Sequence, residues 1–88
     1  MSSILVVAEP TTMWTMWTIY ERPTDYPNDY VARRFVVKPK DPPFSEAVPT
    51  DTVLVNKLSM LRALFRHWGL VCFPAGPNDE PQIVETWL

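Results

Sequence analysis

The clearest hydrophobic periodicity lies in residues 56–68, where apolar side chains recur at the spacing of one helix face. Asn56 is the predicted N-cap, and Gly69 is placed to end the helix in the left-handed conformation, with Leu70 making the apolar contact beyond it. The polar side of the same turns carries Lys57, Ser59, Arg62 and Arg66. The apolar stripe consists of Leu58, Leu61, Leu64, Phe65 and Trp68.

Segments rich in β-branched and aromatic residues predict the strands. They are residues 12–20, 30–38, 70–73 and 82–88, and residues 51–55 add a candidate short edge strand. The short connection between the first two segments favours an antiparallel hairpin with a wide loop.

Proline and glycine usage sharpens this picture, because the chain has 10 Pro and only 2 Gly. The prolines fall between the predicted elements, and residues 39–50 are so rich in them that we expect an extended loop anchored by Phe44 and Val48. Two glycines cannot supply a dinucleotide-binding or P-loop motif, so this kind of phosphate binding is excluded.

The element order is thus β-β-(β)-α-β-β, which predicts an α+β fold. We expect a two-layer sandwich in which one helix packs on a mostly antiparallel sheet of four to five strands. Residues 12–88 form this single domain. Residues 1–11 contain one short apolar run, at positions 4–8, and are either an extra strand or a leader outside the domain.

The first and last strands place large apolar side chains on both of their faces. Trp17 and Ile19 oppose Trp14 and Met16, while Ile83 and Trp87 oppose Val84 and Leu88. A helix of this length, about 20 Å, cannot cover both faces of the sheet, so an exposed apolar patch is expected. The alternative is that residues 1–11 or 39–50 fold over the open face. The predicted interaction surface comprises Trp14, Met16, Tyr20, Arg33, Arg34 and Trp87.

The charge balance argues against a basic nucleic-acid binder, since the net charge is -2. The single basic cluster is Arg33, Arg34, Lys38 and Lys40. With Tyr20 and Tyr30 on adjacent strands, it supports an alternative function in binding single-stranded nucleic acid. Salt bridges from the two arginines to Glu21, Glu46 or Glu85 are the competing interpretation.

Catalytic chemistry has little support in the sequence. A single Cys and a single His exclude a disulfide framework and a four-ligand Cys/His zinc site. His67 and Cys72 are the one candidate nucleophile–base pair, but a solvated helix-end histidine and a small apolar cysteine are the stronger interpretation. The carboxylate pairs Asp25/Asp29 and Asp79/Glu80 lie in turn sequences. We therefore expect no catalytic residues, cofactor or metal.

Two stretches of the sequence resemble a family of short uncharacterised bacterial proteins. The opening is carried by residues 16–23, MWTIYERP, followed by DYP at 25–27 and VARR at 31–34. The close is carried by Gly69-Leu70, Asp79, Pro81 and IVETW at 83–87. The resemblance spans roughly residues 16–88 and implies a small independent domain without assigning an activity or site residues.

Together these patterns predict a non-catalytic interaction module that acts through a protein partner or as a homodimer. No apolar run approaches the ~20 residues of a membrane span, and no signal peptide is recognised. The absence of a signal peptide and the free cysteine favour the cytoplasm.

Overall fold

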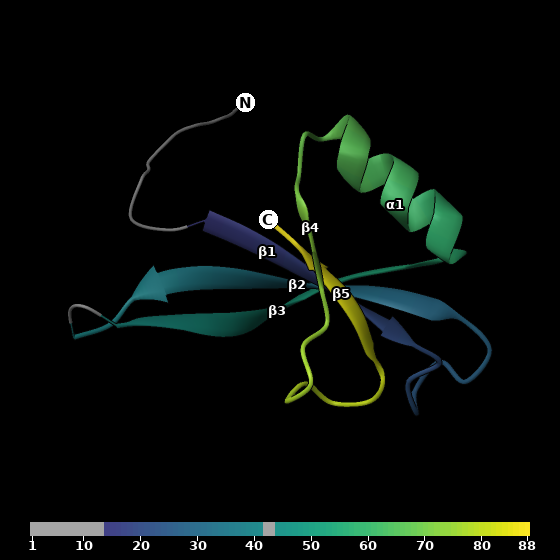
Figure 1. The fold of residues 1–88 in the computed structure, drawn as a ribbon, viewed down its shortest axis with the longest axis horizontal. Coiled ribbons are helices and arrows are strands. Elements are labelled where there is room, and N and C mark those ends of the chain that lie inside the picture. Colours follow the sequence, from purple (N-terminus) through teal and green to yellow (C-terminus); the bar gives the residue numbers. More distant parts are fainter. Residues whose placement is uncertain (1–13, 42–43) are drawn as a thin grey trace.

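The computed structural model describes residues 14–41 and 44–88, which form one sheet and one helix (Figure 1). The α+β class and the order of the elements are confirmed, and the predictions for residues 1–11 lie outside the described residues. The elements are β1 (Trp14–Glu21), β2 (Tyr30–Pro39), β3 (Ser45–Asn56), α1 (Leu58–His67), β4 (Cys72–Pro74) and β5 (Ile83–Trp87).

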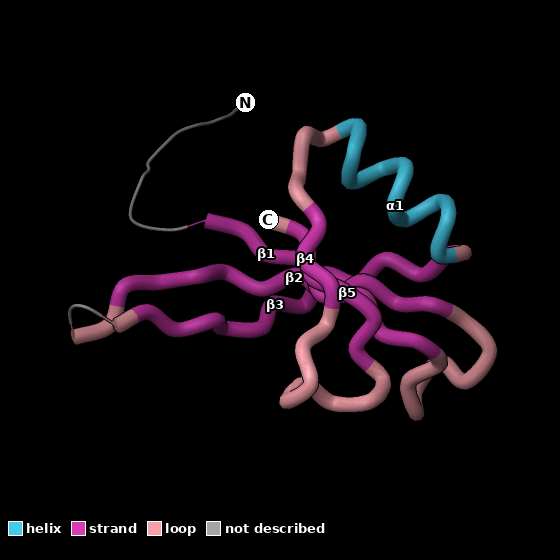
Figure 2. Tube along the Cα trace, in the orientation of Figure 1, coloured by secondary structure: helices cyan, strands magenta, loops and turns pink. Residues whose placement is uncertain are grey.

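The described strands form a five-stranded sheet in the order β3-β2-β1-β5-β4, and every neighbouring pair is antiparallel. The hairpin of β1 and β2 confirms the predicted connection. Helix α1 lies on one side of the sheet and links its two edge strands, β3 and β4 (Figure 2). The end of β2 and the start of β3 extend away from the helix (Figure 1).

Strand β3 corrects the sequence prediction, which assigned residues 39–50 to a loop. The chain turns between Lys40 and Phe44, where the Lys40 N–H donates to the Phe44 carbonyl at 3.0 Å. It then forms a strand through Pro49, which is tolerated because β3 is an edge strand and its outer side needs no N–H donor. The β2–β3 register shifts between Arg33 and Phe35, next to this proline.

The helix starts two residues later than predicted and lacks the predicted cap. Its N-cap position is Lys57, without a side-chain hydrogen bond, while the Asn56 side chain accepts the Lys57 N–H at 2.7 Å. The predicted C-terminus is confirmed. Gly69 has φ of 79°, its N–H donates to Arg66, and the Leu70 N–H donates to Phe65. This double closure of the last turn is the Schellman arrangement.

An aromatic core joins α1 to the sheet. The Phe65 ring lies 5.4 Å from Trp17 and 5.7 Å from both Trp68 and Trp87, measured between centroids. Phe65 is fully buried, whereas Trp68, at the end of the stripe, remains 49% exposed. The predicted stripe therefore packs most tightly at its centre. The core cluster consists of Trp17, Ile19, Ala32, Leu61, Phe65 and Trp87.

A partly buried ion pair joins the helix to β5. Arg62, expected on the polar side of α1, instead donates from Nε to Glu85 Oε2 at 2.9 Å and from Nη2 to Oε1 at 2.7 Å. Trp87 Nε1 also donates to Glu85 Oε2, at 2.8 Å. The Glu85 side chain is only 6% exposed, so its charge depends on these donors.

An irregular register in β5 corrects the predicted faces of the last strand. Ile19 pairs with Glu85 but Tyr20 pairs with Ile83, so Val84 is an extra residue without a partner in β1. Such a bulge reverses the alternation beyond it. Ile83 consequently shares the face of Tyr20, while Val84 packs against the core beneath α1.

Candidate interaction surface

The face of the sheet opposite α1 is apolar, and no helix among the described residues lies over it (Figure 1). Because β1 and β2 pair in regular register, Trp17 and Ile19 face the helix and alternate residues face away. We call this second surface the open face. Its large apolar members are Trp14, Met16, Tyr20, Phe35, Val71, Phe73, Ile83 and Leu88.

One apolar row crosses the open face. Met16 pairs with Phe35, which pairs with Pro49. On the other side, continuing the antiparallel register one step beyond Trp17 and Trp87 sets Leu88 beside Met16. Leu88 and Val71 exchange backbone hydrogen bonds of 2.8 and 3.0 Å. The row thus joins apolar residues of β1, β2 and β3 to Leu88, just after β5, and Val71, just before β4.

The exposed apolar area gathers at the β4 end of this row and at the start of β1. Val71 is 59% exposed, Phe73 50% and Trp14 55%. Val31 and Val37, on the same face, are buried within the sheet surface. Exposed apolar side chains that gather on one surface of a small domain are typical of an interaction site.

The structure brings four of the predicted surface residues together and separates two. Trp14, Met16, Tyr20 and Arg33 share the open face. Trp87 does not belong to any surface, since it pairs with Trp17, faces α1 and is 2% exposed.

Arg34 also lies on the helix side of the sheet, where its guanidinium is 3.4 Å from Thr15 Oγ1. The sequence prediction missed Phe35, Val71, Phe73 and Leu88. Their alternation along each strand was visible, but their common row depends on pairings between distant segments.

The basic cluster does not form one patch. Arg33 points to the open face, where it pairs with Asp25 and lies 6.0 Å above the Tyr20 ring, while Arg34 is on the opposite face. Lys40 lies 3.6 Å from Glu46. Partial burial, followed by the nearby Glu80 carboxylate, raises the pKa of Tyr20. Neither arginine forms a predicted salt bridge within the described residues, because Arg33 pairs with Asp25 and Arg34 contacts Thr15.

The candidate pair His67 and Cys72 is not joined by any hydrogen bond among the described residues. His67 is exposed in the last turn of α1, and Cys72 lies next to Glu85 on the neighbouring strand β5. Partial burial and the negative charge of Glu85 raise the pKa of the Cys72 thiol. This environment opposes thiolate formation, which nucleophilic chemistry requires.

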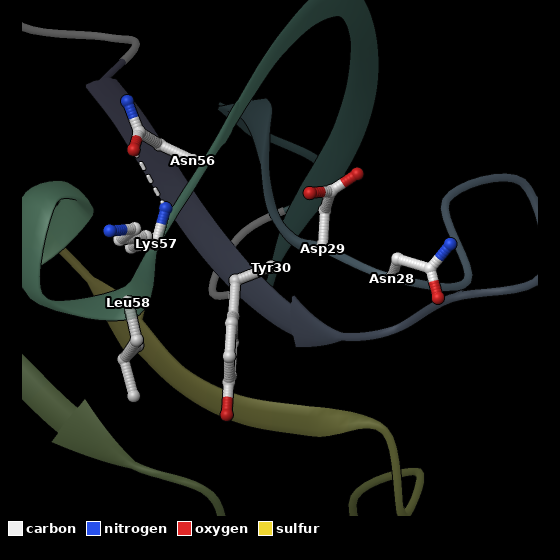
Figure 3. A pocket seen from close by; sticks show the side chains of 6 residues that line it. All are labelled: Asn28, Asp29, Tyr30, Asn56, Lys57 and Leu58. Atoms are coloured by element: carbon white, nitrogen blue, oxygen red, sulfur yellow. Dashed lines mark hydrogen bonds between the residues drawn. The ribbon is translucent and has the colours of Figure 1, made fainter.

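A small pocket lies where the β1–β2 loop meets the start of α1 (Figure 3). Its volume is about 180 Å³, and it is lined by Asn28, Asp29, Tyr30, Asn56, Lys57 and Leu58. The side chains point in different directions, and the Asn56 oxygen is already used by the Lys57 N–H (Figure 3). The polar groups do not converge on a common point, as they would around a small ligand.

Within residues 14–41 and 44–88, no three His, Cys, Asp or Glu side chains gather as a metal site would require. No helix in this part of the chain is long and apolar enough to cross a membrane.

No family model, curated protein or solved structure matches the sequence or its fold. The resemblance to short bacterial proteins therefore stays a prediction.

Proposed function

We propose that the protein is a non-catalytic interaction module that binds a protein partner through its open face. The observation that carries this proposal is the uninterrupted apolar row of Pro49, Phe35, Met16, Leu88 and Val71. A sheet with one solvated face ordinarily alternates apolar and polar residues, so apolar side chains on both faces leave one set without a covering layer.

The chemistry of the open face favours a protein over a nucleic acid. Its charged member, Arg33, is already paired with Asp25, and the whole chain carries a net charge of -2. Phosphate binding would need several free cations on one surface. Large apolar and aromatic side chains are instead the groups that dominate binding energy in protein interfaces.

The test is a double substitution at the exposed β4 end of the open face, Val71→Ser with Phe73→Ser. The full chain, immobilised, is used to capture proteins from a lysate of its own cells, and the captured partner is then purified for a direct affinity measurement. We expect the double variant to weaken binding at least about tenfold, because each lost apolar contact at an interface centre is worth about 1–3 kcal/mol. Both side chains are at least half exposed, so the fold should persist.

The matched control is Phe44→Ser, which removes another exposed phenylalanine, in the β2–β3 turn and outside the open face. It should retain the partner. Equal loss with both variants, or no loss with either, contradicts the proposal. Loss of the captured protein after nuclease treatment, with a steep dependence on salt, would instead establish nucleic-acid binding.

A further inference from the structure

The two outer edges of the described sheet differ in their protection against pairing with another strand. The β4 edge is only three residues long and ends in Pro74. The first half of β3 contains Pro49 and the register shift. Residues 52–56 of β3, TVLVN, contain neither proline nor charge, although these are the features that usually block edge pairing. This segment is an open edge with strong strand propensity.

The same edge lies beside an apolar groove under α1. The groove has a volume of about 210 Å³ and is lined by Leu54, Val55, Asn56, Met60, Leu61 and Leu64. Met60 is 55% exposed. The flank of α1 that carries Met60 continues through Ala63, Leu64 and His67 at helical spacing, without a lysine, arginine or carboxylate. A strand edge without charged residues and a helix flank without lysine, arginine or carboxylate thus lie side by side.

We propose that residues 52–56 pair antiparallel with the same residues of a second copy, around a two-fold axis at Leu54. The pairing sets Val53 opposite Val55 of the second copy, and joins two five-stranded sheets into one. Both α1 helices then lie on the same side of the joined sheet, with their Met60 flanks near the axis. The contact is isologous and closed, so it stops at a dimer.

Charge complementarity favours a second copy of the chain on this edge, paired in this register. With Leu54 on the axis, Asp51 of each copy lies opposite Lys57 of the other, because both are three residues from Leu54. Both side chains are exposed, and neither forms a salt bridge within the described part of the chain. Symmetry produces this pair twice, at the two ends of the paired segment.

The dimer uses a different surface from the proposed function and extends it. Val53 and Val55 pair with Arg33 and Val31, so they point to the open face. Joining the two β3 edges therefore merges two open faces into one continuous surface. The substitutions Val71→Ser and Phe73→Ser lie at the far edge of the sheet and should leave the dimer intact, so failure of one proposal does not imply failure of the other.

The experiment is a charge exchange, followed by sedimentation equilibrium of the full chain over a wide concentration range. Asp51→Lys sets lysine against Lys57 twice and should weaken dimerisation about tenfold, as should Lys57→Asp. The double exchange Asp51→Lys with Lys57→Asp should return the dissociation constant to within about threefold of the original. Lys57→Asp places a favoured residue at the helix N-cap, so unfolding does not explain its effect.

The control for net charge is Asp41→Lys, an identical change in the β2–β3 turn, which should leave the dissociation constant unchanged. A chain that stays monomeric at all concentrations overturns the proposal, whether the edge is empty or is occupied by residues 4–8 of the same chain. A dimer that ignores the single charge reversals, or that the double exchange does not restore, also overturns it.

Discussion

Replacing Arg62 with methionine should destabilise the fold by about 3–5 kcal/mol near neutral pH, one of the largest effects expected for this protein. The variant leaves the Glu85 carboxylate, whose side chain is 6% exposed, with Trp87 Nε1 as its remaining donor. Domains of this size have a total stability of about 5–15 kcal/mol, so the loss is a large fraction of the whole. Urea denaturation followed by circular dichroism measures it directly.

Replacing the two partners of this ion pair should lower the stability by unequal amounts. Arg62 is 38% exposed, so Glu85→Gln leaves a guanidinium that water still solvates, and we expect a smaller cost of about 1–2 kcal/mol. The double variant, Arg62→Met with Glu85→Gln, should recover part of the stability lost in Arg62→Met, because the buried charge is gone. A larger cost for Glu85→Gln than for Arg62→Met would contradict the assignment of Glu85 as the buried, dependent partner.

The stability of the original chain and that of Arg62→Met should depend differently on pH. In the original chain the hydrogen bonds from Arg62 lower the pKa of Glu85 below its ordinary value of 4.5. This pair therefore contributes stability above that value, and the contribution is lost as the pH falls through the lower folded-state pKa. In Arg62→Met, burial without the guanidinium should raise the pKa of Glu85. The loss of stability in Arg62→Met, relative to the original chain, is then greatest near neutral pH and becomes smaller as the pH falls. Denaturation at a series of pH values measures this difference.

Phe65→Ala should cost about 3–5 kcal/mol, comparable to the loss of Arg62. Phe65 is fully buried and its ring contacts three tryptophans, so the truncated side chain leaves a cavity that rigid indole rings cannot fill. Thermal unfolding should show a fall in the melting temperature of more than about 10 °C. The near-ultraviolet circular dichroism of the surrounding tryptophans should weaken as well.

A matched pair of leucines on the same helix provides the control. Leu61 is 2% exposed, whereas Leu64 is only half-buried beside the β3 groove. Leu61→Ala should therefore lower the stability by about 2–5 kcal/mol and Leu64→Ala by clearly less. Equal effects would show that α1 packs on the sheet through a different face.

Much of the fold was predictable because its signals are local. The helix follows from apolar residues at i, i+3, i+4 and i+7 spacing, and its end follows from Gly69, which adopts the positive φ that the closing turn requires. β1 and β2 follow from runs of β-branched and aromatic residues. The expectation that large side chains would occupy both faces of the sheet needed only the period of two along β1.

The residues that were misplaced depend on contacts between distant segments. Pro49 suggested a loop, but an edge position removes the cost of its missing N–H, and the edge is defined by the order of the whole sheet. The extra residue Val84 reverses the face of Ile83, and only pairing with β1 reveals it. The sequence analysis placed Trp87 on the interaction surface, but its pairing with Trp17 places it under α1.

The sequence by itself therefore determined most of the elements, the excess of apolar side chains and the scarcity of catalytic groups. Periodicity, capping and composition act over a few residues, so the chain carries them without reference to its partners. The tertiary structure decided which apolar residues remain uncovered, because β5 lies between β1 and β4 and brings Leu88 and Val71 into line with Met16. It also decided that Glu85 is held by Arg62 and that residues 52–56 form an open edge. Burial and pairing are properties of the assembled sheet, and no local pattern encodes them.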